Sequence, residues 1–337
     1  MRLDEYPSVS LHNVVETVPA AWAEGGDRLH RLPQDVAAQL NEMADDRVRH
    51  PTGSELRFVP ETDDSEVEVT LSAEEPGECH VFWGGFQPWK PTDIGPDPTT
   101  LTLAVPDRLQ TLETDATGAF DPRVCRIRFE RVPAVALHDV TGDCRPPELA
   151  ELPDTRYLAY GTSITEGAAA SADHLNYVSR TARALGWDRL NFGCSGSAYA
   201  DRAMAEYVAQ RDDWDVATLA LSINMANQDF PVQEFRDRAE YFVETVADAH
   251  PDKSIACITL FPYYPDVVEG GDTDRAEGFR AALREIVAET EHPDLHLVDG
   301  TDLTDVSGYT ADILHPGDAG MEAIGRSLAR ELDDRLD

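Results

Sequence analysis

Four short stretches in the second half of the sequence carry residues that could perform chemistry together. Ser163 follows an apolar run in GTSITEG, whereas Asp312 and His315 lie three residues apart in DILHP. A short turn can bring that carboxylate onto the imidazole, which fixes the tautomer and leaves the other ring nitrogen facing outward. This is the relation between orienting acid and base that activates a serine hydroxyl. The set predicts acyl transfer through a covalent serine ester.

The two remaining stretches offer hydrogen-bond donors for a developing oxyanion. Gly193 and Gly196 in NFGCSGSAYAD can turn backbone N–H groups toward a ligand, and Asn224 in SINM offers a side-chain amide. Each feature alone has an ordinary structural interpretation, because serine and asparagine cap helices and glycine makes tight turns. Ser195 is a second candidate nucleophile, although neither serine fits the G-x-S-x-G pattern of a nucleophile elbow.

The elements that must position these residues alternate between strands and helices. Amphipathic helical patterns separate apolar runs, several of them nearly continuous, and these runs predict strands at 156–161, 189–193, 216–224, 254–261 and 295–300. Such alternation predicts a doubly wound parallel sheet covered by helices on both faces, a three-layer α/β/α domain. Ligands of these sheets bind beyond the carboxyl ends of the strands, where the candidate residues fall.

The first half of the sequence has a different rhythm. Short runs that alternate apolar and polar residues predict antiparallel strands with one wetted face, at 56–61, 65–73, 78–85, 99–106 and 124–133. A single short helix is expected at 33–45, with Pro33 just ahead of its first turn. The pattern predicts a β-sandwich, jelly-roll-like accessory domain. The polar, proline-rich stretch 142–154 marks the boundary, so we expect domains at 1–148 and 149–337.

The order Ser, Gly, Asn, Asp-x-x-His makes the C-terminal half resemble an SGNH/GDSL-type hydrolase, a family of lipases and acylhydrolases, over about residues 155 to 337. The resemblance implies that Ser163, His315 and Asp312 are catalytic, and that Ser163, Gly196 and Asn224 form the oxyanion hole. The family's usual Gly-Asp-Ser-Leu reads GTSI here, and its usual Gly-x-Asn-Asp reads SINM. Neither lost acid is the nucleophile, the base or an oxyanion donor, so the departures bear on substrate choice.

The net charge of the chain limits the classes of binding partner that are expected. The 337 residues include 64 acidic and 28 basic side chains, a net charge of −36 spread along the whole chain. This acidity predicts a folded, halophilic protein whose surface stays hydrated in concentrated salt, and it disfavours nucleic acid and anionic membranes as partners. Five scattered cysteines, no apparent signal peptide and no long apolar run predict a cytoplasmic protein with free thiols. Nothing indicates its oligomeric state.

Several functions remain open at this level. The resemblance favours a serine esterase that acts on short-chain or carbohydrate acetyl esters and needs no metal or organic cofactor. If an alcohol binds better than water, the same site would be an acyltransferase. A non-catalytic carbohydrate-binding protein is also open, with Trp83, Phe86 and Trp89 as stacking surfaces. A metal site at His292 and His296 is disfavoured, because Pro293 interrupts any helix between them.

Overall fold

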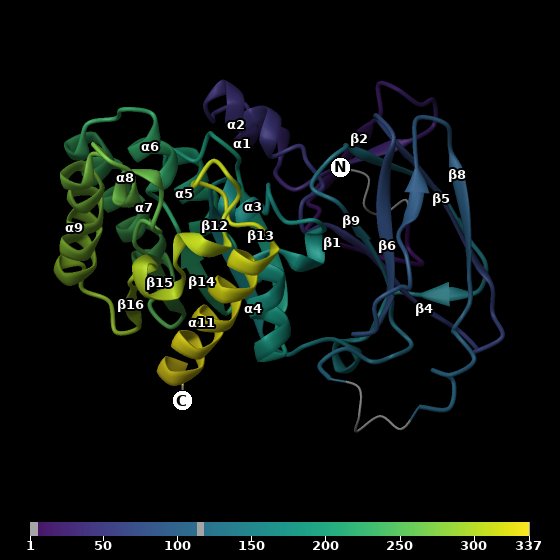
Figure 1. Cartoon of the computed structure of the whole chain (residues 1–337). Coiled ribbons are helices and arrows are strands. Elements are labelled where there is room, and N and C mark those ends of the chain that lie inside the picture. The colour runs from purple at the N-terminus through teal and green to yellow at the C-terminus, as the bar shows by residue number, and fades with distance from the viewer. Residues whose placement is uncertain (1–5, 113–117, 337) are drawn as a thin grey trace. The chain divides into compact units, whose positions relative to one another are not determined.

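The computed structural model describes residues 6–112 and 118–336, and these divide into two compact units (Figure 1). The first unit comprises Met1–Pro33 and Val48–Asp154, and the second comprises Gln34–Arg47 and Thr155–Asp337. The second unit thus takes in a short segment from the N-terminal part of the chain. The sequence-based boundary at 148–149 did not anticipate this segment.

The first unit is built from two antiparallel sheets. One sheet has the order β1-β4-β9-β6-β7 with β11 beside β4, and the other has the order β2-β3-β10-β5-β8. The strands are β1 (Ser10–His12), β2 (Glu16–Pro19), β3 (Asp27–His30), β4 (Glu55–Pro60), β5 (Val67–Ala73), β6 (Gly77–Trp83), β7 (Thr92–Ile94), β8 (Thr99–Leu103), β9 (Cys125–Phe129), β10 (Val135–Thr141) and β11 (Cys144–Arg145). Alternate residues of both sheets, such as Phe58 and Leu71, share one buried core, so the unit is a sandwich.

The opposite face of β4 and β9 departs from the sequence-based expectation of a wetted surface. Glu55 is fully buried there and accepts hydrogen bonds from Arg57 (2.8 Å) and Arg126 (2.7 Å). The Arg126 guanidinium also lies 3.6 Å from the centre of the Phe120 ring. Paired charges can be buried because each satisfies the other's hydrogen-bonding groups, and the alternation of the strand sequence cannot reveal that pairing.

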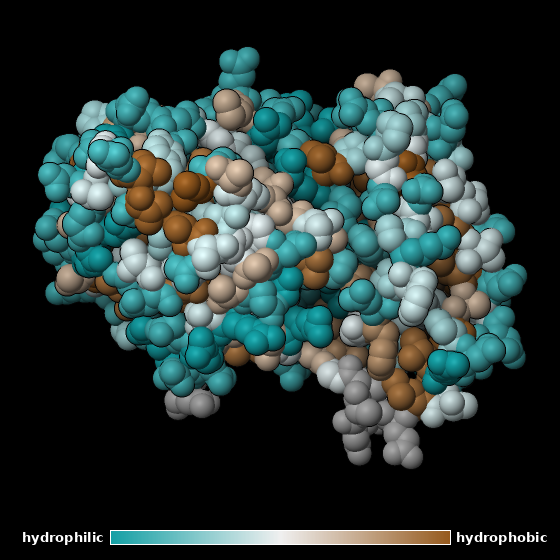
Figure 2. All heavy atoms as spheres, in the orientation of Figure 1, coloured by the Kyte–Doolittle hydropathy of each residue, from teal (hydrophilic) through white to brown (hydrophobic). Residues whose placement is uncertain are grey.

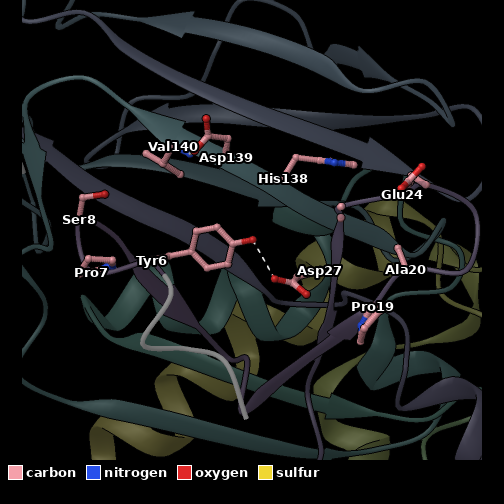
Figure 3. Close-up of a pocket in the computed structure, with 13 residues that line it drawn as sticks. Tyr6, Pro7, Ser8, Pro19, Ala20, Glu24, Asp27, His138, Asp139 and Val140 are labelled. Atoms are coloured by element: carbon pink, nitrogen blue, oxygen red, sulfur yellow. Dashed lines mark hydrogen bonds between the residues drawn. The ribbon is translucent and has the colours of Figure 1, made fainter.

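A pocket of about 720 Å³ opens in the first unit (Figure 3). The Tyr6 hydroxyl donates there to Asp27 Oδ2 (3.0 Å) and to the Leu137 carbonyl (3.1 Å). His138 also lines it, and its Nε2 lies 2.9 Å from Ser72 Oγ. None of the sequence-predicted site residues borders this pocket.

The second unit has a five-stranded parallel sheet with the order β13-β12-β14-β15-β16 (Figure 1). Its strands are β12 (Arg156–Gly161), β13 (Asp188–Gly193), β14 (Val216–Leu219), β15 (Ser254–Ile258) and β16 (Leu295–Val298). The pairing brings Gly161 level with Gly193 and Tyr160 level with Leu219. The loops that follow these three strands therefore meet at one edge of the sheet.

Helices cover both faces of this sheet, as the alternating sequence pattern predicted. They are α3 (Ser163–Glu166), α4 (Tyr177–Leu185), α5 (Arg202–Ala209), α6 (Ile223–Asn227), α7 (Val232–Ala249), α8 (Tyr264–Val267), α9 (Thr273–Glu289), α10 (Gly300–Leu303) and α11 (Asp318–Leu336). The chain runs from β12 outward to β13 and then back past β12 to β14, so right-handed crossovers put α4 and α5 on opposite faces. Accordingly α11 packs on α4, whereas α5 packs on α7.

The N-terminal helix is the main local error of the sequence-based prediction. Residues 33–45 were expected to form one helix, but the chain forms α1 (Gln34–Ala37) and α2 (Glu42–Arg47). The break falls at Asn41, whose side-chain oxygen accepts the Ala44 N–H and so starts a new helix. Of the aromatic residues considered for sugar stacking, Trp83 is buried in the sandwich core, Phe86 is partly exposed and Trp89 is fully exposed.

The surface in view is mostly hydrophilic, with an apolar patch where α8 lies (Figure 2). Its exposed members are Tyr264, Val267 and Val268. Within residues 6–112 and 118–336, no helix is both long enough and apolar enough to cross a bilayer. All five cysteines lie in these ranges, and none forms a disulfide.

Candidate active site

Ser163 is presented by a tight turn at the end of β12. The strand ends at Gly161, Thr162 has extended backbone, and Ser163 is the first residue of α3. A Cβ on Gly161 would lie 2.2 Å from Thr165 Oγ1 and 3.1 Å from the Ala220 carbonyl, so only glycine fits between the turn and the neighbouring strand end. Ser163 is only 6% exposed. Its backbone is therefore rigidly held at the edge where the strand-end loops meet.

His315 and Asp312 complete a hydrogen-bonded line with Ser163, although they lie about 150 residues farther along the chain. Ser163 Oγ is 2.9 Å from His315 Nε2, and His315 Nδ1 is 2.7 Å from Asp312 Oδ2. Because Nδ1 faces a carboxylate, it carries the ring proton and leaves Nε2 as an acceptor for the serine hydroxyl. The arrangement is the one that proton transfer from a serine to a histidine requires.

The Asp312 carboxylate is fixed by its own loop. Its Oδ1 accepts hydrogen bonds from Thr310 Oγ1 (2.6 Å), Leu314 N–H (2.9 Å) and His315 N–H (3.0 Å). Partial burial alone would raise the pKa of Asp312, but the hydrogen bonds from His315, Thr310 and the backbone outweigh it and hold that pKa well below its usual range. Asp312 is therefore ionised near neutral pH, and its charge can stabilise an imidazolium at His315.

Gly196 lies in a turn of the loop between β13 and α5 and has a positive φ of 72°. Its carbonyl oxygen accepts hydrogen bonds from the Tyr199 hydroxyl (2.9 Å) and from Gln228 Nε2 (2.7 Å). These two bonds fix the peptide that follows Gly196. The loop's backbone is thus held by side chains of the same unit rather than by a regular ladder.

A buried carboxylate that the sequence analysis did not identify holds the peptide before that turn. Glu166, only 1% exposed, accepts hydrogen bonds from the Ser195 N–H (2.9 Å) and from the Ser195 hydroxyl. Ser195, the second candidate nucleophile, therefore donates to Glu166, whereas Ser163 faces His315. No local signal distinguishes Glu166 from an ordinary acid in a first helical turn, because its partner lies on another loop.

Asn224 is oriented by a bond to the same loop. Its Oδ1 accepts the Ala198 N–H (3.0 Å), which directs Nδ2 away from that contact as the remaining donor. Asn224 lies in α6, directly after β14, and is 7% exposed. The three predicted oxyanion donors thus belong to the loops that follow β12, β13 and β14, three neighbouring strands.

Two positions where the sequence departs from the usual family pattern are buried, and neither carries a charge. Thr162 is 1% exposed and directly precedes α3, and Met225 is fully buried beside Asn224. The two histidines of the disfavoured metal site have separate hydrogen-bond partners: His292 Nε2 lies 3.0 Å from the His250 carbonyl, and His296 Nε2 contacts Asp294. In the part of the chain that the structure describes, no cluster of three or more metal-ligating side chains occurs.

Residues 159–323 match the model of the GDSL-like lipase/acylhydrolase family and form a domain of that family. This match contains all the residues of the site described above. This domain is therefore a hydrolase domain acting on ester bonds, of the SGNH/GDSL type. No curated protein matches the sequence significantly.

Solved structures extend the similarity over the whole chain. A salicylyl-acyltransferase, SsfX3, from a tetracycline biosynthetic pathway is 15% identical, with 97% of this chain and 95% of that one covered at a TM-score of 0.80. A family two carbohydrate esterase from Cellvibrio japonicus is 14% identical, with coverages of 98% and 97% and a TM-score of 0.64. One from Clostridium thermocellum, solved with cellohexaose, is 17% identical, with coverages of 84% and 92% and a TM-score of 0.60. At these identities the likeness establishes a shared fold.

Proposed function

We propose that the protein is a serine esterase that hydrolyses short-chain esters, with acetyl groups on carbohydrates as the favoured substrate class. The observation that carries the proposal is the line from Ser163 Oγ through His315 to Asp312, with distances of 2.9 Å and 2.7 Å. The fold shared with carbohydrate esterases supports the choice of substrate.

In this mechanism His315 Nε2 takes the proton of Ser163 as the serine oxygen attacks the ester carbonyl. The C=O electron pair moves onto the oxygen, and the resulting tetrahedral intermediate collapses when His315 protonates the departing alcohol. The covalent acyl-serine remains. A water molecule, deprotonated by the same histidine, then attacks it. His315 returns that proton to the serine oxygen as the acid departs, which restores Ser163 and the neutral imidazole. Asp312 stabilises the imidazolium in both halves of the cycle.

The oxyanion would be held by the N–H groups of Ser163 and Gly196 and by the Asn224 amide. The fixed loop geometry supports this assignment, because donors that are already oriented need no reorganisation during the reaction. Losing one such donor raises the barrier by about 2.7–4 kcal/mol in enzymes of this kind.

The test is hydrolysis of p-nitrophenyl acetate by the wild type and by Ser163→Ala, followed by acetylated xylo- and cello-oligosaccharides. We expect the substitution to lower kcat by about 10⁴-fold or more while the fold persists. Ser195→Ala is the matched control and should keep most of the activity. Equal, negligible rates for wild type and Ser163→Ala would refute the proposal.

The assay should extend from low salt to molar salt. The net charge of −36 favours a surface that is hydrated and screened in concentrated salt. We therefore propose that activity and folding persist or improve at molar salt. Loss of the folded state on adding salt would contradict that proposal.

An acyltransferase is a second candidate, favoured by the similarity of the whole chain to a salicylyl-acyltransferase. The chemistry would differ only in the acceptor, because an alcohol would replace water in attacking the acyl-serine. Adding candidate alcohols to the ester assay and measuring new ester alongside free acid distinguishes the two. Transfer that exceeds hydrolysis at millimolar alcohol would favour the acyltransferase.

A further inference from the structure

The segment Gln34–Arg47 comes from the N-terminal part of the chain but belongs to the second unit. Within that unit its first helix, α1, contacts α5, on the face of the sheet opposite to α4 and α11. Figure 1 shows α1 and α2 close to α5, near the carboxyl edge of the sheet. The sequence prediction treated these residues as part of the accessory domain. They instead lie beside the loop that carries Gly196.

Asn41 joins the segment to that loop. Its Nδ2 donates to the Ser197 carbonyl (2.9 Å) and to Asp201 Oδ2 (2.8 Å), while its Oδ1 accepts the Ala44 N–H (3.1 Å). One side chain thus caps α2 and holds it against the residue next to Gly196. The position of α2 relative to the oxyanion loop is therefore set by hydrogen bonds, whose geometry is directional.

Met43 is the residue that this arrangement brings to the site. Its Sδ lies 3.2 Å from the point where a Cβ on Gly196 would stand. Since that point and the backbone nitrogen are both bonded to the same Cα, the sulfur lies within about 6 Å of the Gly196 nitrogen. The Met43 side chain is also 46% exposed, so it borders open space beside a proposed oxyanion donor.

The position of Met43 indicates whether it would contact the acyl group or the alcohol group of an ester. His315 must protonate the leaving alcohol, and its loop leads into α11, which packs with α4 on one face of the sheet. Met43 lies on the α5 side, so the alcohol is expected near His315 and the acyl group on the side of Met43. A flexible, apolar thioether suits contact with an aliphatic or aromatic acyl group.

We propose that Met43, held by Asn41 against the oxyanion loop, forms a wall of the acyl-binding site and limits the length of the acyl group. Met43 is then a specificity-determining residue, and Asn41 is a positioning residue that acts through it. The inference rests on the proposed esterase function and names its acyl-group preference. It assigns a role in acyl-group selection to the N-terminal segment, which lies outside the four stretches that carry Ser163, Gly196, Asn224 and the Asp312–His315 pair.

The experiment compares kcat/KM for p-nitrophenyl acetate, butyrate and hexanoate among variants of the full chain. Met43→Ala should raise the hexanoate-to-acetate ratio by about 5- to 10-fold, because removing the thioether opens space for additional methylene groups. Met43→Phe should lower the butyrate-to-acetate ratio by a similar factor. Asn41→Ala should shift the ratio in the same direction as Met43→Ala, whereas Glu42→Ala, exposed on the same helix, should leave it unchanged.

The outcomes separate this inference from the proposed function. If wild type hydrolyses esters but both Met43 variants, shown to be folded by thermal unfolding, keep the wild-type ratios within twofold, the acyl-wall proposal is wrong and the esterase proposal stands. If wild type hydrolyses none of the esters, both proposals fail. A ratio that shifts equally in Glu42→Ala would also overturn the assignment to Met43.

Discussion

The two loops that bring the candidate residues together are fixed in opposite ways. The loop from Cys194 to Ala198 is held by side chains that lie outside it, namely those of Asn41, Glu166, Tyr199, Asn224 and Gln228. The loop that carries Asp312 and His315 is held from within, by bonds among residues of the same turn. The Glu166 and Asn224 residues are buried, whereas the Asp312 side chain is 49% exposed.

The difference matches the two tasks proposed for the site. Stabilising an oxyanion demands donors fixed in advance and shielded from water, because their contribution depends on low dielectric and small reorganisation. Proton transfer demands only that the imidazole keep its tautomer and direction, which a short Asp-x-x-His turn provides while leaving solvent access for the alcohol and water. We therefore expect changes on the Asn224 side to cost more than changes at Asp312.

Between the two loops, the largest effect is expected at Asn224. Asn224→Ala should lower kcat by about 10²–10³-fold with a small change in KM, because the amide donor acts mainly on the transition state. Steady-state kinetics on p-nitrophenyl acetate measure it. Asn224→Asp retains the oxygen that accepts the Ala198 N–H but loses the donor, so it should be equally impaired. A nearly active Asn224→Asp would argue that the residue only holds the loop.

Glu166 should come next. Glu166→Ala leaves the part-buried Ser195 N–H without its carboxylate partner, and a hydrogen bond to a charged group contributes about 1.5–3 kcal/mol. If that loss is transmitted to the orientation of the Gly196 N–H, kcat falls by about 10- to 150-fold. Glu166→Gln keeps an oxygen acceptor and should recover most of this loss. Full activity in a folded Glu166→Ala would show that the loop keeps its shape without the carboxylate.

Asp312→Ala should have a smaller effect on kcat/KM, about 5- to 30-fold, because water can replace part of a half-exposed carboxylate and the ion pair is screened. A buried triad carboxylate contributes about 10⁴-fold. Kinetics at saturating and at limiting ester concentration measure the loss. A 10⁴-fold loss would show that the half-exposed Asp312 contributes as much as a buried triad carboxylate, and it would contradict the expected difference between the two loops.

The smallest effect concerns Asp299, a second carboxylate with a lowered pKa that lies away from Ser163. Partial burial would raise its pKa, but hydrogen bonds from Arg284 and Thr301 lower it from 3.8 to about 2. A carboxyl with a lowered folded-state pKa stabilises the fold above its unfolded pKa and loses that contribution as pH falls through its folded pKa. Asp299→Asn should therefore lower the free energy of unfolding by about 1–2 kcal/mol near pH 7, after allowance for solvent screening.

Chemical denaturation at several pH values tests this prediction. The difference between wild type and Asp299→Asn should shrink between about pH 4 and pH 2. The kcat of the variant should match wild type. A constant difference across that range, or a loss of kcat, would contradict the interpretation of Asp299 as a purely structural carboxylate.

Strand periodicity predicted the parallel sheet, whose strand ends lie together at one edge. The meeting of Ser163 with His315 and Asp312 was predicted from that rule together with the resemblance to the SGNH/GDSL family. The sequence could not identify Glu166, whose hydrogen-bond partner is Ser195 on a different loop. It also missed β1, β2, β3, β7, β10 and β11, which are short or, in β10, interrupted by a bulge. These strands are specified by their neighbours in the sheet more than by their own alternation.

The segment around Met43 also shows that contacts with residues distant in sequence cannot be predicted from the local sequence. Its residues predict helix locally, and the prediction failed at residues 38–41, between α1 and α2. The local sequence cannot identify the hydrogen-bond partners of Asn41, because the accepting atoms belong to Ser197 and Asp201, far along the chain. Contacts between residues so distant in sequence depend on the completed sheet.

The separation in sequence between residues 34–47 and the rest of the second unit affects how the chain folds and where it can be divided. Residues 34–47 leave the ribosome long before Thr155. The face of the second unit that they cover therefore forms after these residues are already connected to the first unit through the chain. Late, long-range docking of this kind adds to the entropy of loop closure and slows folding. A fragment that begins at Thr155 would lack Met43 and Asn41 and would leave part of α5 uncovered. A single cut in the chain therefore cannot separate the two units.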